Sequence, residues 1–280
     1  MIARPCQSIV RRQIRAGFTF VELMVVIAVL AVLLAMLMPA LASPRANTMV
    51  FQCMENQRRL IQASILYADD YRGYIVPFAN AGGFWAGPTI TINAGVTKAR
   101  AQAAVNAGLT NANSNPLFRY APSLFIYHCP ADLRVQLPPG SGWGYDSYSK
   151  TQNVGGDPYA NYWGCGATCT TLASISSPAE TVCFMEDSDW EGCNSGTWVV
   201  NWAYMGSAFT WEDPVAIFHG NANTQAFADG HAVIHQWQFP SLISSGLACA
   251  AGQPTFGVYA PAYTADYAYV RFMYRFPGWR

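Results

Sequence analysis

The strongest hydrophobic pattern in the chain is a continuous apolar run near its N-terminus. Residues 18–38 contain a single charged side chain, Glu22. At about 1.5 Å per residue, a helix of this length measures roughly 31 Å, close to the thickness of a hydrocarbon core. The pattern therefore predicts a membrane-spanning helix. Pro39 and Pro44 follow, and they predict a kink or a short break in the helix rather than its end.

A second helical pattern follows Pro44, with apolar residues on one stripe. The spacing predicts an amphipathic helix that packs one face on a soluble domain. The apolar stripe contains Val50, Cys53, Met54, Ile61, Ile65 and Ala68, and the polar face contains Gln52, Glu55, Asn56, Arg58, Arg59 and Gln62. We expect this helix to end near Asp70, because Gly73 and Pro77 follow it.

From Gly73 onward, short apolar runs are separated by Gly, Pro, Asn and Ser, which is typical of strands and turns. One further helix is expected at residues 98–109. A helical turn is expected within residues 116–128, followed by a strand into Tyr127–Pro130, and residues 137–170 are expected to form long surface loops. The predicted strands are 180–186, 197–204, 214–219, 223–228 and 231–238, with an edge strand in the tail 259–280.

Asp229 and Gly230 lie between the last two of those internal strands, and Asp-Gly between apolar runs is a strong hairpin signal. The fold class is therefore α+β, with a long N-terminal helix packed on a β-rich globular head. Three regions follow from the pattern: a leader at 1–17, the helix at 18–72, and the head at 73–280.

Composition and charge narrow the class of protein. Apolar residues make up 52% of the 280 residues and charged residues only 11%, well below the roughly 25% charged residues of an ordinary soluble domain. Residues 1–17 contain four arginines and no acid, which leaves twelve basic and sixteen acidic side chains in the rest of the chain. This balance excludes a nucleic-acid-binding protein, which needs a basic face. The basic leader instead indicates a flank that stays in the cytoplasm.

The eight cysteines favour disulfides once the head is outside the cytoplasm. Cys53 and Cys129 are the predicted pair, because a bond between them would tie the long helix to the head. Zinc is an alternative for Cys165, Cys169, Cys183 and Cys193. Only one short C-x3-C spacing occurs among these four, so disulfides are preferred.

The segment Gly17-Phe18-Thr19-Phe20-Val21-Glu22-Leu23, followed by the apolar run, resembles the processing signature of type IV prepilins and type II secretion pseudopilins. The resemblance implies that a prepilin peptidase cuts between Gly17 and Phe18 and that the new amine of Phe18 is methylated. Gly17 has no Cβ, so its backbone can approach an active site closely. Pro39 falls where such proteins carry their helix-kinking proline.

Further motifs resemble a large pilin-like subfamily with a His-x9-Asp-Gly signature near its C-terminus. In this chain His219, nine intervening residues and Asp229-Gly230 fit the signature. Three more segments carry the same resemblance: Cys53-x2-Asn56-x3-Leu60, Tyr67-x2-Asp70-x2-Gly73, and His128-Cys129-Pro130-Ala131-Asp132.

Glu22 is a charged residue within the predicted membrane helix, and its charge needs a partner. A carboxylate at the centre of a membrane helix costs about 2.5–3.5 kcal/mol on insertion scales. The predicted partner that offsets this cost is the Phe18 amine of a neighbouring subunit. The predicted function is therefore structural rather than enzymatic: a subunit anchored in the bacterial inner membrane, with its head outside the cytoplasm. Its partners would be the prepilin peptidase and other pilin or pseudopilin subunits, in a type II secretion pseudopilus or a type IV pilus-like fibre.

Three alternatives remain open at this point. The helix could serve only for export and anchoring of a binding module, with a glycan or protein bound by an aromatic surface at Trp143, Tyr145, Tyr148, Tyr159, Tyr162 and Trp163. Such residues more often pack beneath long loops. His219 and Asp229, with His231 or His235, could hold a metal in an exported enzyme, although a plain hairpin is preferred.

The third alternative is a calcium site. Glu186, Asp187, Asp189 and Glu191 form an acidic cluster after a predicted strand, and calcium prefers several oxygen ligands. The spacing is not that of an EF-hand, so an acidic loop in solvent is the preferred interpretation, and no cofactor is predicted.

Overall fold

The computed structural model describes residues 19–78, 84–85, 87–88, 90–155, 167–188, 197–202, 208–253 and 258–277, with the backbone alone described at 35–46, 208–209 and 258–259. The chain divides into two compact units, Met1–Arg45 and Ala46–Arg280. The predicted leader and the residues on both sides of the predicted cleavage point, Gly17 and Phe18, lie outside the described residues.

In the first unit, the described residues form the beginning of one long helix. Helix α1 spans Phe20–Asp70. As predicted, it does not end at Pro39 or Pro44, but the short break that was considered there does not form. Every side chain described from Phe20 to Leu34 is exposed. Among the described residues, no helix combines the length and the hydropathy that a membrane crossing requires.

The last part of α1, from Ala46 onward, belongs to the head and is buried on one side. Cys53 and Ala68 are fully buried, as the apolar stripe predicted, and so is Leu60. The helix ends at Asp70, as predicted. The backbone N–H of Gly73 closes this end by donating to the carbonyl of Ala68 at 2.7 Å. Gly73 has a φ of +84°, a conformation that glycine adopts without a steric cost.

Five strands form the main sheet of the head. They are β1 (Tyr148–Thr151), β2 (Val182–Glu186), β3 (Thr197–Trp198), β6 (Ala222–Phe227) and β7 (Ala232–Gln236). Their order is β3-β1-β2-β6-β7, and each neighbouring pair is antiparallel except the parallel pair β1 and β3. Strands β6 and β7 pair around Asp229-Gly230, which confirms the predicted hairpin.

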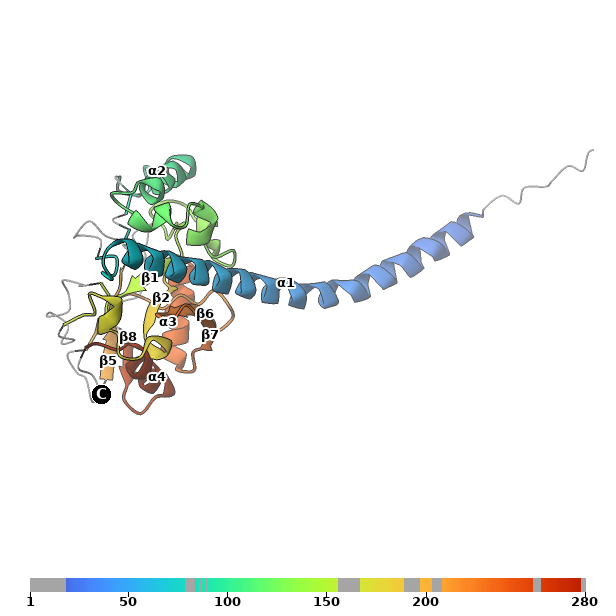
Figure 1. Ribbon diagram of the computed structural model, residues 1–280. Coiled ribbons are helices and arrows are strands. Elements are labelled where there is room, and N and C mark those ends of the chain that lie inside the picture. The colour runs from blue at the N-terminus through green and yellow to red at the C-terminus, as the bar shows by residue number, and fades with distance from the viewer. Residues whose placement is uncertain are drawn as a thin grey trace, which may run out of the picture. The chain divides into compact units, whose positions relative to one another are not determined.

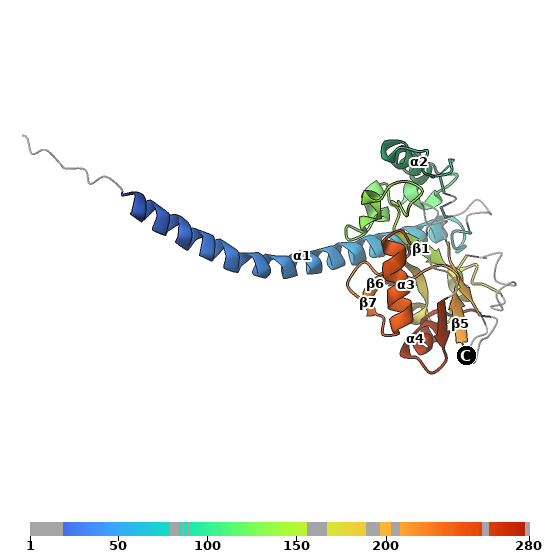
Figure 2. The same ribbon diagram turned by 180° about the vertical axis from the view of Figure 1, so that it is seen from behind.

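A smaller sheet and two helices form the other part of the head. Strands β4 (Val200–Asn201), β5 (Ala208–Trp211) and β8 (Val258–Pro261) are antiparallel in the order β4-β5-β8. Helices α3 (Pro240–Ala250) and α4 (Ala265–Met273) both pack against β8. Figure 2 shows α3 in front of the sheets, with α4 beneath it.

A helical segment between α1 and β1 in the sequence covers the side of α1 that faces away from the main sheet. It begins with α2 (Lys98–Thr110), which confirms the helix predicted at 98–109. Three short 3-10 helices follow: η2 (Pro116–Arg119), η3 (Leu124–Tyr127) and η4 (Leu133–Gln136). Two more precede β2: η5 (Leu172–Ser174) and η6 (Pro178–Glu180).

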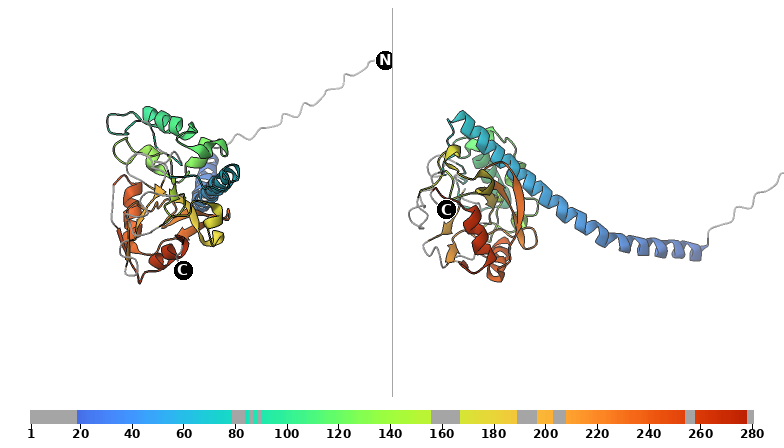
Figure 3. Two further views of the ribbon diagram at one scale, coloured as in Figure 1. Left: turned by 60° about the vertical axis from the view of Figure 1, so that its left-hand side comes forward. Right: turned by 60° about the horizontal axis from the view of Figure 1, so that its bottom comes forward.

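The head part of α1 lies between this helical segment and the main sheet (Figures 1 and 3). One core cluster joins all three layers, with Leu60 of α1, Leu109 of α2 and Phe184 of β2 among its members. A second cluster, which includes Trp198 and Trp211, fills the space beside the smaller sheet. The head part of α1 is therefore an internal element of the head rather than a helix attached to its surface.

Several sequence predictions were wrong. No strand forms at Tyr127–Pro130, where η3 ends, and in 214–219 only an isolated bridge from Val215 to Asp187 forms. The supposed surface loops at 137–170 contain β1 and the buried Trp143. The tail supplies the predicted strand as β8, but it also forms α4.

Leu60 offers a direct measure of how much the buried face of α1 contributes to stability. Leu60→Ala should lower the free energy of unfolding by about 2–5 kcal/mol, because it leaves a cavity in the shared core. The matched control is Leu66→Ala, since Leu66 lies on the same helix and is 49% exposed. Urea denaturation followed by tryptophan fluorescence measures both. Equal effects of the two substitutions would contradict burial of α1 in the head.

Candidate functional site

The first candidate site is the start of α1, where Thr19 and Glu22 form a capping box. The backbone N–H and the hydroxyl of Thr19 both donate to Glu22 Oε2 at 2.8 Å, and the N–H of Glu22 approaches Thr19 Oγ1 at 3.3 Å. This reciprocal pair satisfies backbone donors that the first helical turn otherwise leaves unpaired. The sequence analysis missed this local role of Glu22, although the spacing Thr-x-x-Glu is its signal.

The second candidate site lies where α1 enters the head. A disulfide joins Cys53 of α1 to Cys129, with the two Cα atoms 5.3 Å apart; this is the predicted pair. Next to it, the side-chain amide of Asn56 donates to the carbonyl oxygens of Phe125 and His128 at 3.2 and 3.0 Å. Asn56 is 6% exposed, so its assignment to the polar face was wrong. The reason is that the segment packed on α1 presents carbonyls that need donors.

A buried glutamine on the same helix reaches the sheet. The side-chain amide of Gln57 donates to the carbonyl of Thr224 in β6 at 2.8 Å. Asn56 and Gln57 therefore point polar groups into the layers on two sides of α1. Both side-chain NH2 groups donate to backbone carbonyls, as buried polar donors usually do.

His219 lies beside the disulfide. Its Nε2 is 3.0 Å from Glu186 Oε1 and 3.4 Å from the sulfur of Cys129. The second carboxylate oxygen of Glu186 accepts the backbone N–H of Thr224 at 2.8 Å. The side chain of His219 is 3% exposed and that of Glu186 is fully buried. Glu186 thus connects the end of β2 to β6 and to His219.

Asp229 and Gly230, at the other end of the His-x9-Asp-Gly signature, form the turn between β6 and β7. Asp229 Oδ1 accepts the N–H of His231 at 3.1 Å and lies 2.5 Å from its ring Nδ1. Desolvation acts to raise the pKa of Asp229, but the hydrogen bonds from His231 outweigh it and hold the pKa below the usual value. Gly230 has a φ of +97°, which favours glycine in the turn. The structure therefore does not bring His219 and Asp229 together; they mark the two ends of β6.

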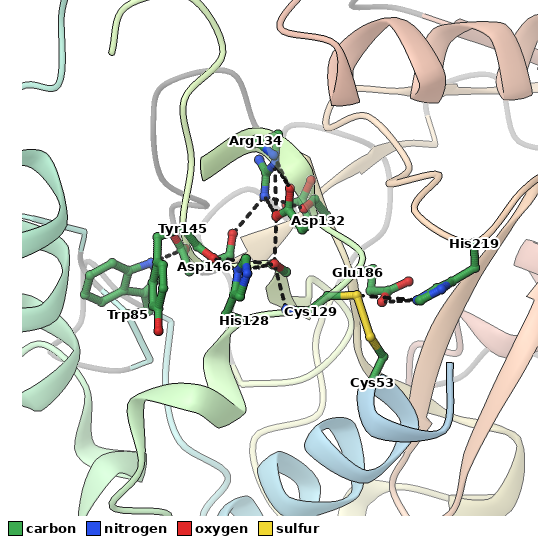
Figure 4. A network of polar contacts seen from close by, with 12 residues as sticks. Cys53, Trp85, His128, Cys129, Asp132, Arg134, Tyr145, Asp146, Glu186 and His219 are labelled. Carbon is green, nitrogen blue, oxygen red and sulfur yellow. Dashed lines mark hydrogen bonds and ion pairs between the residues drawn. A yellow bond between two sulfur atoms is a disulfide. The ribbon is translucent and has the colours of Figure 1, made fainter. Parts of the chain in front are cut away.

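A buried ion pair continues the network beyond Cys129 (Figure 4). The hydroxyl of Ser147 accepts the N–H of Cys129 at 3.0 Å and donates to Asp132 at 2.7 Å. Asp132 in turn holds the guanidinium of Arg134 at 2.8–3.1 Å. Burial acts to lower the pKa of Arg134, but the carboxylate of Asp132 outweighs it and raises that pKa.

Arg134 also donates to the carbonyl oxygens of Asp146 and Asp187 at 2.8 and 3.2 Å. Asp146 accepts the indole N–H of Trp85 at 2.6 Å. Figure 4 shows Trp85, Asp146 and Arg134 on one side of Cys129 and His219 on the other. The network fixes the chain that follows η3, and with it the position of Cys129.

The remaining sequence candidates have different outcomes. Glu186 and Asp187 are buried, so the prediction of an acidic loop in solvent was wrong for both. Asp189 and Glu191 lie outside the described residues, which leaves the alternative of a calcium site untested. Cys169 and Cys183 carry free buried thiols, and burial raises the pKa of each. Cys165 and Cys193 lie outside the described residues.

The predicted aromatic surface is not formed by its described members. Trp143 and Tyr148 are each 2% exposed, and Tyr145 stacks on His128 with ring centroids 4.9 Å apart. Tyr159, Tyr162 and Trp163 lie outside the described residues. The described aromatic residues therefore pack the interior, as the preferred interpretation held.

The histidines of β7 and its turn do not converge with His219 on a metal site. His231 pairs with Asp229, and His235 stacks on Tyr269 with ring centroids 3.5 Å apart. Burial lowers the pKa of His235 to about 4, against an opposing effect of Asp266. Among the described residues, the side chains with metal-ligand atoms close enough to share one ion are Cys53, Cys129, Glu186 and His219, all within 4.8 Å of one another.

Comparison with known proteins bears on the first site. Residues 12–38 match the family model of the prokaryotic N-terminal methylation motif, so the chain carries the type IV prepilin-like signature that contains Gly17, Phe18 and Glu22. No curated protein and no solved structure matches the chain. The match covers the N-terminal part of the chain, and the α+β head follows it.

The buried ion pair should be costly to break. Asp132→Ala leaves the guanidinium of Arg134 without its closest carboxylate, and we expect the free energy of unfolding to fall by about 3–5 kcal/mol. Glu55→Ala is the matched control, because it removes the acid from the half-exposed pair with Arg59 and should cost at most about 1 kcal/mol. Chemical denaturation measures both. A cost for Asp132→Ala no larger than the control would contradict this account.

His235 should make the head less stable in acid. Its folded pKa of about 4 lies below the ordinary 6.5, so the unfolded state takes up the proton first as the pH falls. The stabilisation is complete above about pH 6.5 and is lost as the pH falls toward about 4. His235→Phe keeps a ring against Tyr269 and should flatten this part of the stability curve. A slope unchanged in His235→Phe would refute the assignment.

Proposed function

We propose that this protein is a structural pilin-like subunit, processed by a prepilin peptidase and assembled through its N-terminal helix into a type II secretion pseudopilus or a type IV pilus-like fibre. The observation that carries this proposal is the methylation motif over residues 12–38, which ends in an apolar helix whose described side chains are exposed. Fifteen consecutive exposed positions, 20–34, are costly in water. A bilayer, and later the helices of other subunits, would cover them.

Processing is the first step of the proposed function. The arginine-rich leader would keep residues 1–17 on the cytoplasmic side, while the head would lie outside the cytoplasm. The peptidase would cut after Gly17 and methylate the amine of Phe18. The disulfide at the entry of α1 into the head supports this topology, because disulfides persist in oxidising compartments.

Assembly would use the charge of Glu22. In a fibre of packed apolar helices, its carboxylate would pair with the methylated amine of Phe18 on a neighbouring subunit, which offsets the burial of both charges. The capping box does not prevent this pairing. An ionised carboxylate accepts about four hydrogen bonds, and the Thr19 contacts converge on Oε2. Pro39 lacks a backbone N–H and would weaken the helix locally, which would help it to adjust during packing.

The test separates the charge of Glu22 from its role in the capping box. Glu22→Gln keeps a residue that can form the box but removes the charge, whereas Glu22→Ala removes both. We expect both variants to be cleaved, with a mature methylated N-terminus at Phe18 by mass spectrometry. Cross-linking between subunits in cells should fall at least tenfold in both, as loss of a buried ion-pair partner costs about 3–5 kcal/mol.

Glu55→Gln is the control, because Glu55 is an exposed acid on the same helix; it should cross-link like the unaltered protein. Normal cross-linking of Glu22→Gln would show that charge does not drive assembly. A chain that still begins at Met1 in cells would refute processing, and with it the whole proposal.

A further inference from the structure

The four side chains around the disulfide form a ligand set that the proposed function does not use. Cys53 comes from α1, Cys129 from the segment after η3, Glu186 from the end of β2, and His219 from the loop before β6. Two sulfurs, an imidazole nitrogen and a carboxylate oxygen are donors that zinc-class cations accept in tetrahedral sites. We propose that, when the disulfide is reduced, these four residues bind one divalent cation of this class.

The distances already resemble those of such a site. With metal bonds of about 2.0–2.3 Å, a tetrahedral ion holds its nitrogen and oxygen ligands about 3.3 Å apart, and its nitrogen and sulfur ligands about 3.5 Å apart. Here His219 Nε2 is 3.0 Å from Glu186 Oε1 and 3.4 Å from Cys129 Sγ. All four ligand atoms lie within 4.8 Å of one another. The two sulfurs must separate, to about 3.8 Å, and breaking their bond frees both side chains to rotate.

The surroundings also suit a metal site. Cys53, Cys129 and Glu186 are fully buried, so water competes weakly for the ion. The carboxylate of Glu186 is oriented by the backbone N–H of Thr224 at 2.8 Å, and outer hydrogen bonds of this kind hold metal-binding carboxylates in place. The ion would join α1 to the segment after η3, the end of β2 and the loop before β6. In the oxidised protein, the disulfide and the contacts of His219 join the same four elements.

Reduction of the disulfide by a phosphine gives the two thiols that the site needs. A phosphine takes an oxygen atom from water and becomes a phosphine oxide, the S–S bond breaks, and each sulfur gains one proton. Each thiol then releases its proton to the buffer as the divalent cation binds. The junction between α1 and the head would thus be closed by a covalent bond in oxidising surroundings and by an ion in reducing surroundings.

The experiment uses the full-length protein, reduced by a water-soluble phosphine without oxygen and titrated with Co2+. We expect the visible bands of tetrahedral Co2+ and thiolate-to-cobalt charge transfer, both absent before reduction and both abolished by Zn2+. His219→Ala and Glu186→Gln should each weaken cobalt binding at least about tenfold. His231→Ala and Cys183→Ser alter residues outside the cluster and should bind as the unaltered protein does.

Circular dichroism of the oxidised variants checks that each one folds before reduction. If reduction alone unfolds the chain, recovery of the native spectrum on adding Zn2+ supports the site, and failure to recover overturns it. The proposal is also overturned if the folded, reduced protein shows no charge-transfer band. Equal cobalt affinity in His219→Ala and the unaltered protein would overturn it too, because the cysteines alone would then account for binding.

Discussion

The structure depends on the way α1 is buried in the head. A helix that lies between two layers must satisfy the polar groups of both while it fills an apolar core. Asn56 donates to the carbonyl oxygens at η3, Gln57 donates to β6, and Leu60 fills the core between them. The disulfide at Cys53 fixes the register of these contacts. A helix rotated or shifted by one residue would lose all of them at once, so the junction has a single arrangement.

The structural roles of the motif residues between Cys53 and Gly230 are explained by this junction between α1 and the head. The Cys-x2-Asn-x3-Leu spacing puts all three side chains on the buried face of α1. Asp70 accepts the hydroxyl of Tyr120 at 2.7 Å, and Gly73 ends the helix. His219 and Asp229-Gly230 delimit β6, the strand that Gln57 contacts. These signatures therefore specify how the head holds the helix, whereas the methylation motif concerns the other end of the chain.

The sequence was sufficient for local features and insufficient for contacts between distant segments. Helix α2, the end of α1 and the Asp-Gly hairpin follow from short-range patterns, and all three are present. Strand β1 could not be predicted, because it buries a lysine, Lys150, whose ammonium donates to the carbonyl oxygens of Val76 and Val154. The contact of His219 with Glu186 spans 33 residues, and no spacing rule connects them. The site at the start of α1 could thus be predicted from its motif, whereas the contacts around the Cys53–Cys129 disulfide could be identified only from the fold.

The position of the disulfide has a mechanical consequence. Among the side chains described in the head part of α1, Cys53 is the first from the N-terminal side to be fully buried. Tension applied along the helix therefore reaches a covalent bond before it reaches the hydrogen bonds of Asn56 and Gln57. The bond transfers that load to the segment anchored by Arg134, and the turns of α1 beyond it are shielded. Under tension, α1 would therefore extend or break elsewhere before it is pulled out of the head.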